Sequence, residues 1–150
     1  MIDGEFRVNA SIERTWDFLT NIQEVASCVP SFEKVEVRDD KSFTIIVSQK
    51  VGPFSATFET QTSFTQMIPP NRLVAFGRGK DTLMGSSFEL TNEMDLVAIS
   101  EKETLVKYKA DVKISGRIAS VGQSLIKIVA KREVASVVKL IQDKIGGLVP

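Results

Sequence analysis

The chain has 150 residues, a length that suits a single domain, over residues 1–150, with a sizeable hydrophobic core. Its 19 basic and 19 acidic residues cancel, so no overall charge attracts nucleic acid, an anionic membrane surface or a polyanionic substrate. The sequence contains no histidine, which removes the commonest general base and the most frequent transition-metal ligand. We therefore expect no catalytic residue, no metal site and no cofactor.

The start of the chain and its cysteine content predict a cytoplasmic protein. Met1 to Glu5 lack the basic region and apolar run of a signal peptide. No stretch approaches the roughly 18 apolar residues that a membrane-spanning helix needs. Cys28 is the only cysteine, so no internal disulfide can form, and we expect a buried, inert thiol there.

The first thirty or so residues are predicted to form one short strand and two short helices. Phe6 to Val8 has the apolar pattern of a strand, and Ser11 is placed to cap the helix that follows. That helix carries apolar side chains at helical spacing, namely Ile12, Trp16 and Leu19. We expect Trp16 to plug the core. Asn21 is expected to cap a second short helix, which Pro30 ends.

From residue 32 onward the apolar period changes to two, which is typical of strands. Six runs separated by short turns predict an antiparallel meander, at residues 32–38, 42–50, 53–65, 72–79, 83–97 and 103–114. One face of this sheet is apolar, with Phe54, Ala56, Phe58, Phe64, Phe88, Leu90, Met94, Leu96, Val106, Tyr108, Ala110 and Val112.

Two clusters of polar residues on these strands are expected to be structural features and not functional sites. Gly77 to Lys80 has two glycines and two cations, but no helix signal follows, so a hairpin turn is favoured over a phosphate-binding loop. On the polar face, Glu93 and Asp95 can pair with lysines of the next strand, Lys107 and Lys109, which favours a solvated face over a metal site.

The last part of the chain, Ser115 to Gly147, is predicted to be one long amphipathic helix that Ser115 caps and Gly146, Gly147 and Pro150 end. Its first half buries one side, with Ile118, Val121, Leu125, Ile128 and Val129. The stripe then turns toward Val134, Val137, Leu140, Ile141 and Ile145, which leaves Arg132 and Ser136 facing inward. Inward polar groups favour a lined space under the helix over solid packing. The lysines of this helix, interleaved with Glu133 and Asp143, are expected to form an exposed face.

These elements predict an α+β layered domain in which a curved, seven-stranded antiparallel sheet wraps around the long C-terminal helix. This order resembles the helix-grip fold of the START and Bet v 1-like superfamily. Six motifs in order resemble the CoxG family of carbon monoxide dehydrogenase subunits: Phe6-x-Val8, Glu13-x-x-Trp16-x-x-Leu19, Cys28-Val29-Pro30, Lys50-Val51-Gly52-Pro53, Leu83-Met84-Gly85-Ser86 and Gly116-Arg117-Ile118-Ala119-Ser120-Val121-Gly122.

The resemblance covers nearly the whole chain. It implies a non-catalytic accessory role beside molybdenum hydroxylases of the carbon monoxide dehydrogenase type, with an apolar cavity for a quinone or lipid-like molecule. Ser31 stands where the family usually has a glycine, and many members continue beyond this domain into a membrane-attaching tail, whereas this chain stops at Pro150. Membrane contact is therefore expected to be peripheral at most.

The expected binding site is an apolar chamber between the sheet and the closing helix. Its predicted walls are Phe54, Phe58, Phe64, Phe88, Leu90, Val106, Leu125, Ile128 and Val129. Tyr108, the only tyrosine, and Arg132 are predicted to orient the ligand, because a few polar groups fix the pose in such pockets.

Three functions are compatible with these features of the sequence. The first is a carrier of an apolar or quinone-like molecule for an oxidoreductase, without a nucleic-acid partner. The second is an enzyme of the cyclase or aromatase type, with Tyr108 as acid and Arg132 as the orienting group. The third is an assembly factor with a filled interior, which binds a protein through a sheet edge or through the stripe of Val134, Val137 and Ile141.

Overall fold

The computed structural model describes residues 2–81 and 85–147. Leu83, Met84 and Pro150, which enter the motifs and the predicted helix end, lie outside the described residues. The elements in chain order are β1 (Ile2–Val8), α1 (Ile12–Thr20), α2 (Ile22–Ala26), β2 (Phe32–Val37), β3 (Ser42–Val51), β4 (Phe54–Ile68), β5 (Arg72–Asp81), β6 (Ser86–Ser100), β7 (Glu103–Ser115), the 3₁₀ helix η1 (Arg117–Val121), α3 (Gln123–Gln142) and the π-helical turn η2 (Asp143–Gly147).

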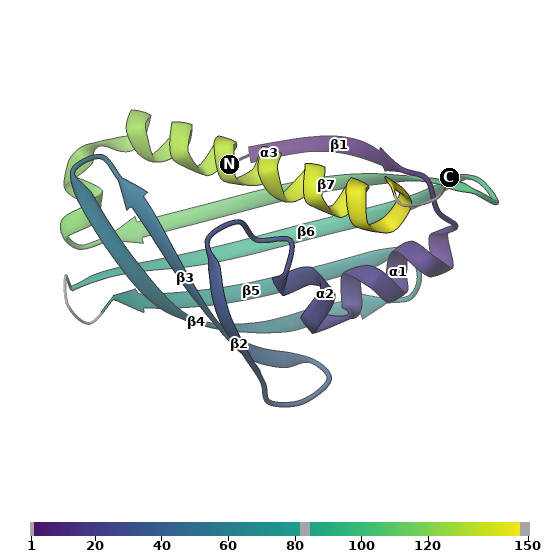
Figure 1. The fold of residues 1–150 in the computed structure, drawn as a ribbon, viewed down its shortest axis with the longest axis horizontal. Coiled ribbons are helices and arrows are strands. Elements are labelled where there is room, and N and C mark those ends of the chain that lie inside the picture. The colour runs from purple at the N-terminus through teal and green to yellow at the C-terminus, as the bar shows by residue number, and fades with distance from the viewer. Residues whose placement is uncertain (1, 82–84, 148–150) are drawn as a thin grey trace.

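The strands form one seven-stranded sheet in the order β1-β7-β6-β5-β4-β3-β2, and all neighbours are antiparallel. The helix α3 runs along one face of this sheet, and α1 and α2 lie near its C-terminal end (Figure 1). The meander, the two short helices after the first strand and the C-terminal helix confirm the predicted α+β architecture. None of the helices in the described part of the chain has both the length and the apolar character needed to cross a membrane.

The predicted N-caps of α1 and α2 are confirmed. The side chain of Ser11 accepts a hydrogen bond from the backbone N–H of Arg14 at 3.2 Å, and Asn21 accepts one from the N–H of Glu24 at the same distance. The helix that Ser11 caps turns its apolar side to the sheet, where Trp16 packs into the core. Capping and apolar spacing therefore fix the position of α1 over one end of the sheet.

A long closing helix is present, but its predicted start at Ser115 is wrong. Ser115 is the last residue of β7, where its hydroxyl lies 2.7 Å from that of Ser87, and it caps no helix. Two glycines then interrupt the chain: Gly116 has φ 90° and ψ −158°, and Gly122 has φ 97° and ψ 153°. These conformations are nearly restricted to glycine and lie outside the helical region. The helix α3 therefore begins only at Gln123.

The predicted hairpin turn at Gly77 to Lys80 is also wrong, because these residues belong to β5. Gly79 lies directly opposite Phe88 of β6, and the Phe88 ring lies over it. A Cβ atom on Gly79 would come within 2.3 Å of Cε1 of that ring. The glycine thus serves ring packing inside a strand rather than a turn.

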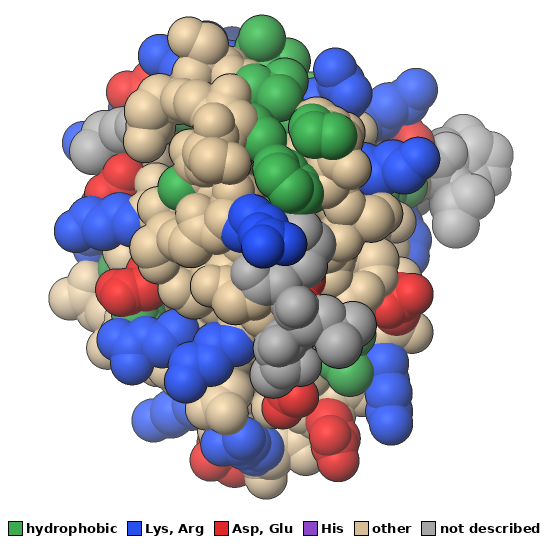
Figure 2. Space-filling view, turned by 90° about the vertical axis from the view of Figure 1, so that its left-hand side faces the viewer, with side chains coloured by type: hydrophobic (Ala, Val, Ile, Leu, Met, Phe, Trp, Pro, Cys, Tyr) green, Lys and Arg blue, Asp and Glu red, His purple; other side chains and the backbone are tan. Residues whose placement is uncertain are grey.

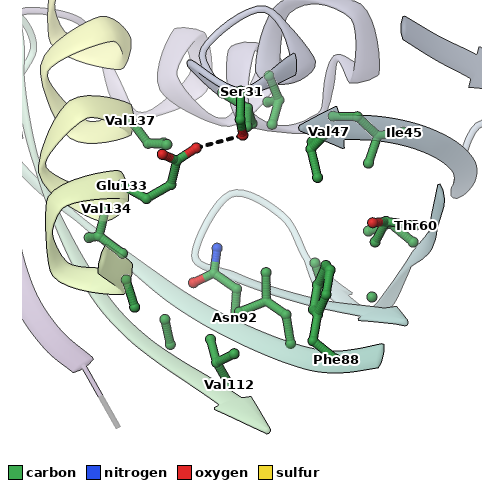
Figure 3. Close-up of a pocket in the computed structure, with 18 of the residues that line it drawn as sticks. Ser31, Ile45, Val47, Thr60, Phe88, Asn92, Val112, Glu133, Val134 and Val137 are labelled. Atoms are coloured by element: carbon green, nitrogen blue, oxygen red, sulfur yellow. Dashed lines mark hydrogen bonds between the residues drawn. The ribbon is translucent and has the colours of Figure 1, made fainter. Parts of the chain in front are cut away.

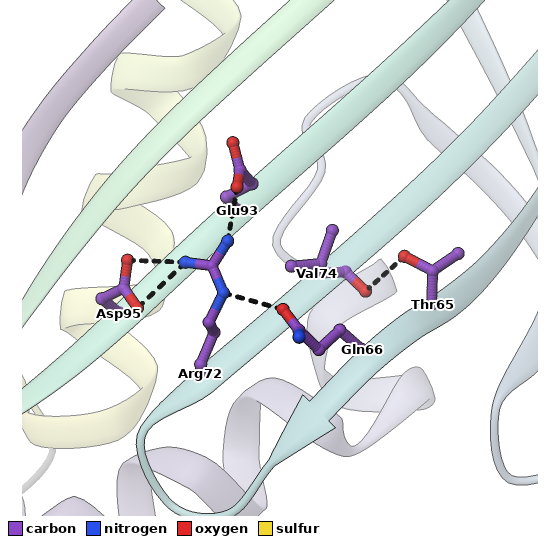
Figure 4. Close-up of polar contacts among 6 residues, drawn as sticks. All are labelled: Thr65, Gln66, Arg72, Val74, Glu93 and Asp95. Carbon is purple, nitrogen blue, oxygen red and sulfur yellow. Dashed lines mark hydrogen bonds and ion pairs between the residues drawn. The ribbon is translucent and has the colours of Figure 1, made fainter.

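The convex face of the sheet is polar, as predicted, but its acids meet a different partner. Arg72 of β5 forms ion pairs with Glu93 and Asp95 of β6 and a 2.8 Å hydrogen bond with Gln66 (Figure 4). The planar guanidinium of Arg72 contacts both carboxylates at once through separate N–H groups. No group of three or more potential ligands within the described residues could hold a metal ion.

The end of the molecule that carries the start of α3 mixes both signs of charge, and hydrophobic side chains gather in one part of it (Figure 2). This mixture agrees with the overall charge balance of the chain.

One buried cluster lies beneath α1 and the C-terminal part of α3, and another lies beneath η1 and the start of α3. Between these two clusters, the middle of α3 faces the concave side of the sheet.

Candidate functional site

A cavity of about 390 Å³ lies between the concave face of the sheet and α3 (Figure 3). This volume falls in the range of small-molecule binding sites. Its walls come from β1 and β3 to β7, from the helices α1, α2 and α3 and from η1, and most of the lining side chains are apolar. The cavity arises because the two buried clusters pack the ends of the helix against the sheet and leave the middle unfilled.

The sheet wall follows from the period of two along each strand. Phe58 of β4 and Phe88 of β6 meet edge to face, with ring centroids 4.9 Å apart, and both line the cavity. Ala75 of β5 and Ala110 of β7 stand directly opposite Asn92 of β6, and all three side chains also line it. Because these two neighbours are small, the amide of Asn92 projects beyond them into the cavity.

The helix wall is a stripe at spacings of three and four residues. It consists of Ile126, Val129, Ala130, Glu133, Val134, Val137, Val138 and Ile141. The predicted stripe had the wrong phase, because it assumed that one helix continues from Ile118 and Val121 into α3. These two residues belong to η1, and the chain is interrupted at Gly122 before α3 begins. As a result Leu125 and Ile128 do not line the cavity, and Ile128 is 53% exposed.

Six of the residues predicted to contact a ligand do line the cavity: Phe58, Phe64, Phe88, Leu90, Tyr108 and Val129. Phe54 and Val106 face the same side of the sheet but lie beyond its middle. Val106 is fully buried in the cluster near α1, and Phe54 packs against the cluster beneath η1. Their apolar side chains therefore close the ends of the chamber instead of lining it.

Of the two residues predicted to orient the ligand, Tyr108 lines the cavity and Arg132 does not. Arg132 is exposed on the outer side of α3, because the helix phase turns its neighbour Glu133 inward instead. The ring of Tyr108 leans over Gly4 of β1, which lies opposite it, and stands 6.0 Å from the ring of Phe6. A tyrosine is thus present at the cavity wall without the cation expected beside it.

Glu133 is the main polar group of the site, and the prediction that it belongs to an exposed face is wrong. Its Oε1 accepts a hydrogen bond from the hydroxyl of Ser31 at 2.8 Å, and its Oε2 accepts one from Nε2 of Gln49 at 3.4 Å. Figure 3 shows Glu133 reaching from α3 toward Ser31 across the edge of the cavity. The sequence did hold a signal for its inward position: Glu133 lies seven residues, or about two helical turns, after the inward residue Ile126.

Sequence reasoning also missed Asn92 and Thr60. Both continue a period of two, Asn92 between Leu90 and Met94, and Thr60 after Phe58. Thr60 is only 5% exposed, and its Oγ1 is the one buried side-chain oxygen or nitrogen in the described residues that lacks a hydrogen-bond partner. A polar residue within an apolar alternation was therefore the available signal at both positions.

The predicted burial of Cys28 is confirmed, and this residue lies outside the cavity wall. Burial raises the pKa of its thiol, and the nearby positive charge of Lys144 opposes that rise. Lys144 is half-buried, contrary to the predicted exposed face, because its ammonium group donates a hydrogen bond to Ser27. The thiol is therefore an inert core group.

A curved antiparallel sheet closed by a C-terminal helix, with two short helices after the first strand, defines the class of proteins with the helix-grip fold. Within that class, the chain matches the CoxG family of carbon monoxide dehydrogenase subunits over residues 4–146. The chain belongs to this family.

Solved structures agree with this fold. A conserved protein from Geobacillus kaustophilus is 18% identical, with a TM-score of 0.85 over 95% of this chain and 93% of that one. A START superfamily protein from Mycobacterium smegmatis is 14% identical, with a TM-score of 0.69 over 96% and 95%. An aromatase/cyclase from Streptomyces sp. R1128 is 14% identical, with a TM-score of 0.64 over 96% and 92%. A comparison with curated protein sequences found no significant match.

Proposed function

We propose that the protein binds an apolar, quinone-like or lipid-like small molecule in the cavity between the sheet and α3, without catalysing a reaction on it. The observation that supports this most directly is the cavity itself, which holds about 390 Å³ and is lined mainly by aliphatic and aromatic side chains. Such a space gains binding free energy by removing the apolar surface of a ligand from water. Few polar groups are then needed to fix its pose.

Membership of the CoxG family supports an accessory role for this binding. In this proposal the protein carries, shields or presents its ligand to a molybdenum hydroxylase of the carbon monoxide dehydrogenase type in the cytoplasm. The cavity supports a carrier over the assembly factor with a filled interior. The stripe of Val134, Val137 and Ile141, which that alternative offered as a docking surface, faces the cavity and is covered by the sheet.

A cyclase-type enzyme is the second candidate. It is favoured by Glu133, whose carboxylate lies in the wall of the same cavity that Tyr108 lines. In this candidate Glu133, in place of Arg132, would act with Tyr108 as the acid–base pair. Turnover of an aromatic polyketide precursor that Glu133→Gln abolishes, while binding persists, would establish this role.

Extraction and titration test the carrier. We expect organic extraction of freshly purified protein to release a co-purified apolar molecule, which mass spectrometry identifies. We also expect delipidated protein to bind the neutral dye N-phenyl-1-naphthylamine. The variant Ala110→Phe places a ring inside the cavity, because Ala110 is 7% exposed and lines it. It should weaken dye binding by about tenfold or more, since the ring occupies the ligand's volume.

Ala135→Phe is the matched control, because Ala135 lies on the exposed side of α3 and outside the cavity wall. It should leave the affinity for the dye unchanged. Protein that carries no extractable molecule and binds no dye, or equal dye affinity in both variants, would refute the proposed function.

A further inference from the structure

The charges around the cavity are unbalanced. Glu133 is the only charged side chain among the described residues that line it, and no lysine or arginine of that wall faces the ligand space. The two groups that hold its carboxylate, the Ser31 hydroxyl and the Gln49 amide, are neutral donors. A ligand that brings a second negative charge into this apolar space would meet like charge without a compensating cation.

The opposite wall offers a group that can both donate and accept hydrogen bonds. Asn92 projects from β6 between Ala75 and Ala110, and within the described chain its amide has no hydrogen-bond partner. Figure 3 shows its side chain pointing up from the sheet into the cavity, on the side where Glu133 projects from α3. A ligand head between these two walls would contact a fixed acceptor above and an amide below.

The chemistry of the ligand head follows from these two partners. An alcohol or phenol can donate its hydrogen to the Glu133 carboxylate while its oxygen accepts from the Asn92 amide. An amine or ammonium can donate to both side chains. An ether or ketone can satisfy only Asn92, and a carboxylate ligand is repelled by Glu133.

We propose that this cavity selects ligands whose head group donates a hydrogen bond, namely an alcohol, phenol or amine, and rejects carboxylate-bearing ligands such as fatty acids. The inference rests on the proposed function, because it assigns the chemistry of a ligand in the same cavity. Among quinone-like molecules, it favours the hydroquinone, whose hydroxyls donate, over the quinone, whose carbonyls only accept.

Four probes with the same ten-carbon chain test this selection at pH 8: decan-1-ol, decyl methyl ether, decylamine and decanoate. Each displaces N-phenyl-1-naphthylamine from delipidated protein, below the concentration at which the probe forms micelles. We expect decan-1-ol and decylamine to bind about tenfold or more tightly than decanoate. Decyl methyl ether should fall between them, because it satisfies Asn92 and leaves Glu133 without a donor.

Substitutions of single residues test which side chains cause this preference among the four probes. Glu133→Gln, which keeps the size of the side chain, should raise the affinity for decanoate by about tenfold and narrow its gap to decan-1-ol. Glu59→Gln is the matched control, because Glu59 is exposed on the convex face of the sheet, and it should change no affinity. Asn92→Ala should weaken decan-1-ol and decyl methyl ether alike.

The outcomes separate the two proposals. Dye binding together with equal affinities for decanoate and decan-1-ol, or a ranking that Glu133→Gln leaves unchanged, would overturn the charge selection while the apolar site stands. A wild-type protein that binds neither the dye nor any of the four probes would overturn the proposed function, and the selection with it.

Discussion

At Gly79 the lack of a side chain gives the Phe88 ring its place in the cavity wall. In Gly79→Ala the ring must move toward the ligand space, because the new Cβ would lie 2.3 Å from its Cε1. We expect the free energy of unfolding to fall by about 1–3 kcal/mol in a urea titration and the affinity for an apolar dye to fall too. Gly77→Ala is the milder comparison, because its nearest contact, Oγ1 of Thr62, lies at 3.1 Å, so we expect a smaller loss there. An equal loss in both variants would contradict this role of Gly79.

Single residues of the site differed in how well the sequence predicted them. The inward aromatic residues Phe58 and Phe88 were predictable because strand alternation needs no exact starting point. The sequence prediction placed Arg132 inward and Glu133 outward, which is the reverse of the structure. A helix turns by about 100° per residue, so an error of one residue in phase moves a side chain from one face to another. That phase depended on where α3 starts, which the conformations of Gly116 and Gly122 decide.

Among the elements, these two glycines separate β7, η1 and α3 from one another. Gly122→Ala should lower the free energy of unfolding by about 1–3 kcal/mol, because its φ of 97° strains any other residue although no atom lies within 4 Å of the new Cβ. Gly116→Ala should cost more, because it adds a contact of 2.4 Å with the carbonyl oxygen of Gly85. Urea unfolding of both variants measures the difference. Two neutral substitutions would contradict the strain that these conformations impose on residues other than glycine.

The six strands of the meander and the two capped helices were predicted within about three residues of their observed limits, because period-two alternation and the side-chain caps at Ser11 and Asn21 are local signals. The first strand was predicted too short, since it begins at Ile2 and not at Phe6. The break before α3 was not predicted, since a serine followed by a glycine is also a plausible helix start. The hydroxyl of Ser115 instead meets Ser87 across a strand pair, a contact between distant parts of the chain. Local pattern alone could not reveal such a partner.

Across the whole molecule, α3 is held more firmly at its C-terminal end. There Gln142 donates a 2.9 Å hydrogen bond to the carbonyl of Arg7, and Lys144 donates one to Ser27. At the other end, the residue preceding α3, Gly122, supplies no side-chain cap. We expect hydrogen exchange to be about tenfold faster, or more, for the amides of residues 127–130 than for those of residues 137–141.

Gln142→Ala should reduce this difference by loosening only the anchored end, with little change in exchange at residues 127–130. Uniform protection along α3 would contradict the expectation that the helix opens from its N-terminal side. Mass spectrometry of peptides from the exchanged protein resolves both segments.

The position of Trp16 has a practical consequence for studying this protein. It is the only tryptophan, it is 8% exposed in the cluster beneath α1, and it does not line the cavity. Its indole emission will therefore shift when that cluster is exposed to water, whereas a ligand in the cavity can reach the indole only through cluster members that line the wall, such as Leu19 and Leu73. The chain thus carries a natural fluorophore that reports denaturation and stands outside the wall that a ligand would touch.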